Sequence, residues 1–136
     1  MKAAIVAGYT HIDTAAVYKN EKSVGEEIKE IGIKRENLFV TSKVWNTECG
    51  YDKTLKAFDK TLSDLGLDYL DLNLSHWPAN ELQFGKDANQ QNVDTWKAMD
   101  RLHEEGLICS IGLSNFMQHH AEPVMGRQTS VRWLTR

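Results

Sequence analysis

Apolar residues recur along the chain in two alternating patterns, short runs typical of buried strands and stripes at helical spacing. The short runs predict four strands, over residues 10–15, 38–44, 69–76 and 108–115. A helical pattern follows each of them, over residues 20–32, 51–66, 92–106 and from about Gln118. The order βαβαβαβα predicts parallel strands joined by right-handed crossovers.

Residues at the ends of the helical patterns support these limits. Asn20 is a suitable N-cap for the first helix, and Asp52 can cap the second. Gly66 can end the second helix, because glycine adopts the left-handed conformation that helix ends favour. The sequence MKAAIVAGY at the start resembles the tail of a preceding helix.

The alternation is compatible with a doubly wound sheet or with part of a (β/α)₈ barrel, and both place chemistry at the carboxyl ends of the strands. Polar or aromatic side chains stand at the end of every predicted strand: Asp13 and Tyr18, Lys43 and Trp45, His76 and Trp77, and Ser114 and Asn115. Each of them alone has an ordinary explanation in a turn, a cap or a packed core. Their joint placement at consecutive strand ends instead indicates a functional site.

Composition restricts the class of protein. The chain has 136 residues, 41% hydrophobic and 26% charged, which predicts one globular domain over residues 1–136. Its net charge is -3 and its basic residues are scattered among acids, so no nucleic-acid partner is expected. The apolar runs are short, and the N-terminus passes into His11 and Asp13 too soon for a signal peptide. These features favour a cytoplasmic protein without a membrane partner.

Cysteines and histidines give no metal-site pattern. Cys49 and Cys109 are far apart and form no C-x-x-C motif, so we expect buried or free thiols. The adjacent pair His119 and His120 is interpreted as part of the surface at a helix start, because one such pair cannot supply a tetrahedral zinc site. No metal is expected.

Tyr18 and Lys22 match Y-x-x-x-K, the Tyr/Lys pair of short-chain dehydrogenases. Those enzymes carry the pair along one helix and need a glycine-rich turn upstream, whereas the nine glycines here form no G-x-G. With Asn20 as the cap, the helix starts after Tyr18, and Lys22 lies opposite the apolar stripe of that helix. The pattern therefore predicts a solvated Lys22, and a short-chain dehydrogenase is the weakest alternative.

Several ordered motifs resemble successive signatures of the aldo-keto reductases, especially the bacterial branch with the 2,5-diketo-gluconate reductases. The motifs are GYTHIDTAAVYKNEKSVGEEI, LFVTSKVWN, LGLDYLDLNLSHWP, and IGLSNF followed by HHAEP, and the match runs from about Gly8 to about Met125. The resemblance implies part of a (β/α)₈ barrel, covering about four βα units from strand two to strand five. It also implies an enzyme that reduces aldehydes or ketones, such as keto sugars, with NADPH.

The resemblance also assigns roles to individual residues. It places a catalytic tetrad on Asp13, Tyr18, Lys43 and His76. It places contacts to the nicotinamide carboxamide on Ser114 and Asn115, and Asp13 also lies at the cofactor. It places the wall of the substrate pocket on Trp45, with His76 and Trp77 also facing the substrate.

The chemistry of carbonyl reduction explains why such residues are needed. Hydride transfer to a carbonyl carbon leaves negative charge on the oxygen, so a proton donor must lie within about 3 Å, and Tyr18 is the candidate. A nearby ammonium favours the phenolate of a tyrosine, and Lys43 would supply it. Asp13 would keep Lys43 charged and fixed. His76 could donate a hydrogen bond to the carbonyl oxygen.

The chain departs from the family in length. A complete barrel needs about 250 residues, and the segment GRQTSVRWLTR after Met125 no longer resembles the family. No lysine or arginine can be assigned to the cofactor phosphates. An open part-barrel has unpaired edges, which predicts self-association. The alternative to an active reductase is therefore a truncated, non-catalytic remnant of one.

Overall fold

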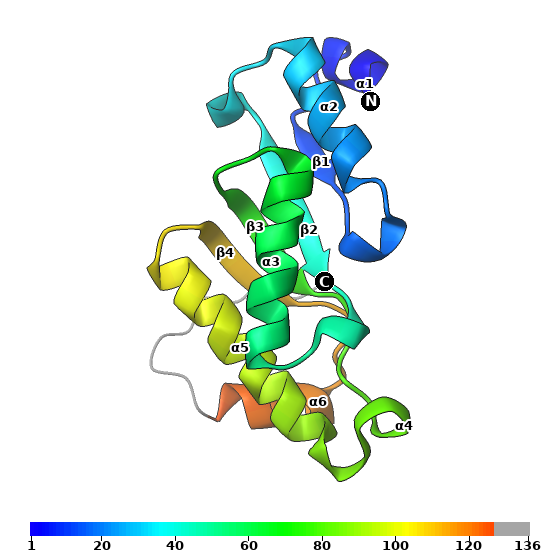
Figure 1. Ribbon diagram of the computed structural model, residues 1–136, viewed down its shortest axis with the longest axis vertical. Coiled ribbons are helices and arrows are strands. Elements are labelled where there is room, and N and C mark those ends of the chain that lie inside the picture. Colours follow the sequence, from blue (N-terminus) through cyan, green and yellow to red (C-terminus); the bar gives the residue numbers. More distant parts are fainter. Residues whose placement is uncertain (127–136) are drawn as a thin grey trace.

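The computed structural model describes residues 1–126 and contains four parallel strands with helices between them (Figure 1). The strands are β1 (His11–Asp13), β2 (Phe39–Val44), β3 (Leu70–Ser75) and β4 (Ile108–Leu113). They form one sheet in the order β1-β2-β3-β4, and each neighbouring pair is parallel. All four predicted strands are confirmed, and each is one to three residues shorter than predicted. The chain end over residues 127–136, where the family pattern was expected to stop, lies outside the described residues.

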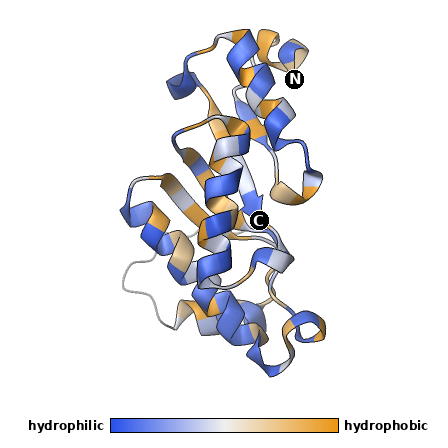
Figure 2. Ribbon diagram, viewed as in Figure 1, coloured by the Kyte–Doolittle hydropathy of each residue, from blue (hydrophilic) through white to orange (hydrophobic). Residues whose placement is uncertain are grey.

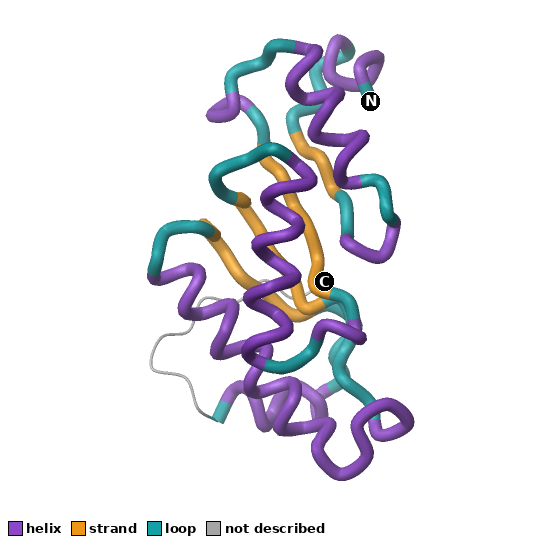
Figure 3. Tube along the Cα trace, viewed as in Figure 1, coloured by secondary structure: helices purple, strands orange, loops and turns teal. Residues whose placement is uncertain are grey.

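Helices and short 3₁₀ turns connect the strands. The helices are α1 (Lys2–Val6), α2 (Glu21–Ile31), α3 (Tyr51–Leu65), α4 (Glu81–Phe84), α5 (Ala88–Glu104) and α6 (Gln118–Met125). The 3₁₀ turns are η1 (Ala16–Tyr18), η2 (Arg35–Asn37), η3 (Asn46–Glu48) and η4 (Gly85–Asp87). The tube in Figure 3 shows this regular strand-to-helix succession.

Two predictions about helices were incomplete. The helix α5 begins at Ala88, four residues before the predicted start, because its polar first turn contains good helix formers but no apolar stripe. The short helix α4 was not predicted, and Asn80 caps it by accepting a hydrogen bond from the Gln83 amide at 3.1 Å.

The predicted caps were partly wrong. The N-cap of α3 is Gly50 and not Asp52, because Gly50 has a φ of 107° and its amide donates to Thr95 Oγ1 at 2.8 Å. Gly66 ends α3 with a φ of 63°, as predicted. Asn20 occupies the N-cap position of α2, but its side chain accepts from Thr14 Oγ1 at 2.8 Å and bonds no helix amide.

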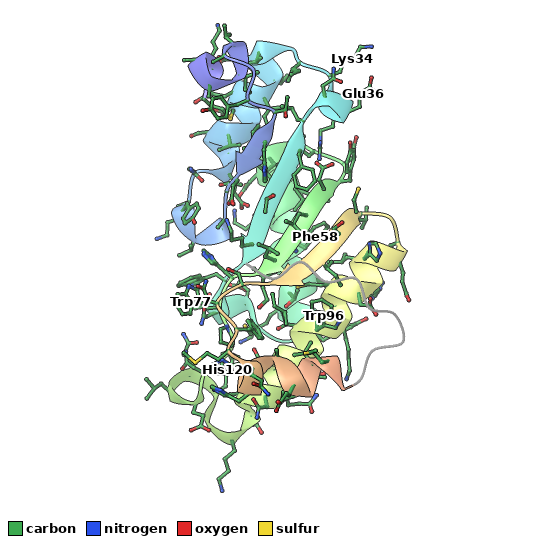
Figure 4. The ribbon with its side chains drawn as sticks, turned by 180° about the vertical axis from the view of Figure 1, so that it is seen from behind. Lys34, Glu36, Phe58, Trp77, Trp96 and His120 are labelled. Carbon is green, nitrogen blue, oxygen red and sulfur yellow. The ribbon has the colours of Figure 1, made fainter. Side chains whose placement is uncertain are left out.

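The helices α2, α3 and α5 cover one face of the sheet (Figure 1). The core between them contains buried side chains from both layers, among them Val40, Leu70, Phe58 and Met99. Hydrophilic residues follow the outward surfaces of these helices (Figure 2). In residues 1–126 no helix lies over the opposite face of the sheet (Figure 4).

Gly25 allows α2 to approach α3 closely. A Cβ atom at this position would lie 2.3 Å from the backbone oxygen of Leu65, which is far inside a normal contact. None of the helices in this part of the chain has the length and apolar character needed to cross a membrane.

Candidate active site

Lys43 lies at the carboxyl end of β2, on the sheet face opposite α2, α3 and α5. Successive side chains of a strand point to opposite faces, so Ser42 points toward the helices and Lys43 points away from them. The Lys43 side chain is only 8% exposed, and its ammonium forms an ion pair with the carboxylate of Asp13. It also donates to the backbone oxygen of Thr14 at 3.0 Å. The strand end of β1 therefore holds this buried charge in place.

Tyr18 is the last residue of η1, directly beyond β1. Its ring is half-exposed, and Lys43 Nζ lies 5.5 Å from the ring centroid. Lys19 follows in the left-handed conformation with a φ of 54°, which ends the turn before α2 begins. The local backbone thus presents Tyr18 to the lysine of the neighbouring strand.

His76 is the first residue after β3. Its amide donates to the Val44 backbone oxygen at 3.0 Å, which extends the pairing of β3 with β2 by one residue. The imidazole is 9% exposed and meets two rings edge-on: Tyr18 at a centroid distance of 5.9 Å and Trp45 at 5.2 Å. His76 therefore closes one side of the group formed by Tyr18 and Lys43.

Burial lowers the pKa of His76 below its usual value, and the charge of Lys43 lowers it further, while Asp13 acts in the opposite direction. The net effect favours the neutral imidazole. Its Nδ1 atom is buried and has no hydrogen-bond partner in the described part of the chain. A neutral imidazole can donate one hydrogen bond and accept another.

Ser114 and Asn115 follow β4 and lie beside His76. The Ser114 amide donates to the Ser75 backbone oxygen at 2.9 Å, so the strand pairing continues to this point. Asn115 has a φ of 62°, and its Nδ2 donates to the His76 backbone oxygen at 2.8 Å and to Ser114 Oγ at 3.1 Å. An amide and a hydroxyl are thereby gathered at the end of the fourth strand.

The two predicted pocket tryptophans differ in their surroundings. Trp45 is half-buried against His76. Trp77 is 47% exposed, and its backbone oxygen accepts from Ser75 Oγ at 3.5 Å. Figure 4 shows Trp77 beyond the carboxyl ends of the strands. The structure therefore brings Trp45 into contact with His76 and leaves Trp77 open to solvent.

The alternative pairing of Tyr18 with Lys22 is not supported by the geometry. Tyr18 belongs to η1 and Lys22 to α2, and Lys19 between them leaves the helical conformation. The two residues are therefore not a helical i, i+4 pair. Lys22 is exposed, as predicted.

Three residues of the site escaped the sequence reasoning: Thr14, Asn20 in its observed role, and Glu21. Glu21 is 5% exposed and accepts hydrogen bonds from Ser42 and Thr61. A signal for its burial was available, because Glu21 shares the helical i, i+3, i+7 stripe with Val24 and Ile28. The contacts of Thr14 depend on the tertiary structure and left no such signal.

The remaining chemistry-bearing residues lie apart from this group. Cys49 is buried and Cys109 is exposed, and both are free thiols, as expected. The rings of His119 and His120 have centroids 3.9 Å apart and planes tilted by 51°. Among residues 1–126 no group of three or more His, Cys, Asp and Glu side chains could hold a metal ion.

The fold is a four-strand segment of a (β/α)₈ barrel with polar side chains gathered at the carboxyl ends of its strands. The chain belongs to the aldo/keto reductase family, whose family model matches residues 1–133. This match confirms the resemblance and extends beyond the predicted limits of Gly8 and Met125.

Individual relatives agree with the family assignment. The chain is 54% identical over 125 residues to a glyoxal reductase of Bacillus subtilis, a match that covers 92% of this chain and 42% of the relative. It is 50% identical over 117 residues to a 9,11-endoperoxide prostaglandin H2 reductase of Trypanosoma cruzi, covering 86% and 38%. A solved aldo/keto reductase from Brucella melitensis superimposes with a TM-score of 0.89 at 42% identity, covering 98% and 49%. The chain thus spans about two fifths of the length of these curated relatives.

Proposed function

We propose that this chain carries the proton-donating and carbonyl-orienting residues of an NADPH-dependent reductase of aldehydes and ketones. The observation that carries the proposal is the convergence of Asp13, Tyr18, Lys43 and His76 at the ends of three neighbouring strands. The family membership supports an oxidoreductase in general terms. The geometry supports the assignment of roles to these four side chains.

In this proposal Tyr18 donates the proton to the carbonyl oxygen of the substrate. Its half-exposed ring leaves the hydroxyl accessible to a small molecule, and Lys43 Nζ lies 5.5 Å from the ring centroid, where its positive charge would stabilise negative charge that develops during the reaction. Asp13 and the Thr14 backbone oxygen hold the Lys43 side chain in its buried position. A charge held in place before the reaction requires no reorganisation when the proton moves.

His76 orients the substrate carbonyl in this proposal. A neutral imidazole donates one hydrogen bond without bringing a second positive charge next to Lys43, and the lowered pKa of His76 favours that neutral form. Trp45 packs against the imidazole, and together with Trp77 it would form the apolar wall of the substrate pocket.

Ser114 and Asn115 fit the amide end of a nicotinamide. Their hydroxyl and amide groups adjoin each other and lie next to His76, so they can exchange hydrogen bonds with a carboxamide. When bound, NADPH supplies the hydride that reduces the carbonyl carbon. Ser114, Asn115 and Asp13 are the residues of this chain that we assign to cofactor binding.

The substrate class is a small carbonyl compound. The Bacillus subtilis relative is named a glyoxal reductase, and glyoxal is a small dialdehyde. We propose reactive aldehydes of that kind as substrates of this chain. Keto sugars and similar small ketones belong to the same proposal. A cytoplasmic location and self-association through the edges of the sheet stay predictions of the sequence.

The test compares Tyr18→Phe with the matched control Tyr9→Phe, since Tyr9 is 67% exposed and lies outside the site. The loss of NADPH absorbance with glyoxal measures turnover. Loss of a general acid removes about 10²- to 10⁴-fold of rate, so kcat/KM should fall by that factor in Tyr18→Phe only. NADPH fluorescence measures cofactor binding independently.

Equal rates in the two variants would contradict the role given to Tyr18. A parent chain that neither binds NADPH nor reduces glyoxal would instead favour the alternative of a non-catalytic member of the family.

A further inference from the structure

Glu21 is a buried carboxylate for which the proposed reaction has no use. It begins α2, three residues after Tyr18, and is 5% exposed. Ser42 Oγ donates to its Oε1 at 2.5 Å, and Thr61 Oγ1 donates to its Oε2 at 3.1 Å. None of the ion pairs formed within residues 1–126 includes Glu21. Removing a carboxylate from water costs free energy, which its hydrogen bonds to the surrounding groups must offset.

Through Ser42, Glu21 belongs to a closed ring of contacts that passes through Lys43. The Lys43 ammonium donates to the Thr14 backbone oxygen at 3.0 Å, and Thr14 Oγ1 donates to Asn20 Oδ1 at 2.8 Å. Asn20 is bonded in the chain to Glu21, which accepts from Ser42, and Ser42 is bonded in the chain to Lys43. The ring joins the ends of β1 and β2 to the start of α2.

Tyr18 lies on the segment that this ring closes. The hydrogen bond between Thr14 and Asn20 joins the two ends of this segment, and Thr14 is also bonded to Lys43. Tyr18 lies between Thr14 and Asn20 in the chain. Its ring is half-exposed, and the ring centroid lies 5.5 Å from Lys43 Nζ and 5.9 Å from the centroid of the His76 ring. The position of Tyr18 relative to Lys43 therefore depends on the hydrogen bonds of Thr14, Asn20 and Glu21.

We propose that Glu21 is a positioning residue that, through Ser42, fixes the separation of Tyr18 from Lys43. Ser42 and Lys43 are adjacent on β2 and point to opposite faces of the sheet. The hydrogen bond from Ser42 to Glu21 on the helix-covered face therefore holds the strand that carries Lys43 on the opposite face. This inference rests on the proposed function for its kinetic consequence. A displacement of about 1 Å at a reacting pair can cost about 10²-fold in rate.

The two hydroxyls that bond Glu21 provide a matched pair of variants. Ser42→Ala and Thr61→Val each remove one hydrogen bond from the same buried carboxylate, but only Ser42 lies on the strand of Lys43. We expect similar losses of thermal stability in both. We expect kcat to fall about tenfold to a hundredfold in Ser42→Ala with little change in KM, and to stay near the parent value in Thr61→Val.

Substitutions of Glu21 itself extend the test. Glu21→Ala should lower kcat as Ser42→Ala does, whereas Glu21→Gln keeps an acceptor for Ser42 and should restore most of the rate. Glu30→Ala removes an exposed carboxylate from the same helix and should change nothing. Equal kcat in Ser42→Ala and Thr61→Val, whether both fall or both stay high, would overturn the inference.

A second readout separates this inference from the proposed function. In a labelled chain, nuclear Overhauser contacts between the Tyr18 ring and the Lys43 side chain report their separation without any turnover. We expect these contacts to weaken in Ser42→Ala and Glu21→Ala and to persist in Thr61→Val. If the parent chain lacks turnover, the proposed function fails while this pattern still supports the positioning role. Contacts that persist in all variants overturn it.

Discussion

Two ion pairs mark opposite ends of the sheet and differ in how far their charged groups are exposed to solvent. At the amino end, near Lys34 and Glu36 in Figure 4, Arg35 Nη2 donates to Asp71 Oδ2 at 2.6 Å. The same guanidinium donates to the backbone oxygens of Leu38 and Tyr69 and lies 4.0 Å from the centroid of the Tyr69 ring. Within the described residues, Nε is the one guanidinium nitrogen without a partner.

The pair of Lys43 and Asp13 at the carboxyl end is more open on the side of its carboxylate. Lys43 is 8% exposed while Asp13 is 55% exposed, and the rings of Tyr18 and His76 stand beside them. The amino-end pair is enclosed by backbone and side-chain partners, whereas the carboxyl-end pair leaves groups open to a molecule from solution. This contrast fits a stabilising role for the first pair and the catalytic role proposed for the second, since chemistry in a parallel barrel lies at the carboxyl ends of its strands.

The largest effect is expected from Lys43→Met. Lys43→Met removes one partner of the ion pair, which costs most where the remaining charge is buried, but Asp13 is 55% exposed and stays hydrated when alone. Turnover of glyoxal should nevertheless fall by about 10²- to 10⁴-fold, because Tyr18 loses its neighbouring charge. Lys22→Met is the control and should keep the parent rate. A loss of melting temperature that accounts for all the lost activity would contradict this division of roles.

The second-largest effect is expected from Asp71→Ala, which should lower the stability of the fold and leave the rate unchanged. Its carboxylate accepts from Arg35 and from the Val40 amide at 2.8 Å, so its removal leaves mostly buried donors unsatisfied. The free energy of unfolding should fall by about 2–3 kcal/mol, as measured by urea denaturation. The rate per folded molecule should stay unchanged, and the exposed Asp68→Ala is the matched control. A reduced kcat in folded Asp71→Ala would remove the contrast between the two ends.

Much of this arrangement could be predicted from the sequence because strands and helices have different periods. The apolar pattern placed all four strands, and parallel strands bring their carboxyl ends to one edge, so Asp13, Lys43 and His76 could be expected there. Helical phase also separated Tyr18 from Lys22. These inferences depend on local periodicity and on topology.

The features that the pattern missed depend on contacts between distant residues. Gly50 caps α3 because its amide meets Thr95, 45 residues away, and no local signal records that contact. The clamp of Arg35 on Asp71 joins residues 36 apart in the same manner. The polar start of α5 carries no apolar stripe, so periodicity could not find its first turn.

The smallest expected effect is a pH dependence of stability that arises at the carboxyl end of the sheet. Burial and the charge of Lys43 lower the pKa of His76 in the folded chain below its usual 6.5. Below about pH 6.5 the unfolded chain binds a proton at this histidine that the folded chain resists, so unfolding becomes more favourable. The stabilising contribution of neutral His76 is therefore fully present above about pH 6.5 and is lost as the pH falls through the lower, folded value.

Urea denaturation of the parent and of His76→Gln on both sides of about pH 6.5 measures this contribution. The variant should lose less stability than the parent as the pH falls, because glutamine does not titrate. Asp71→Ala, whose change lies at the other end of the sheet, should lower the whole curve and keep the slope of the parent in this window. If the free energy of unfolding of His76→Gln kept the pH dependence of the parent, that dependence would have to come from a group other than His76.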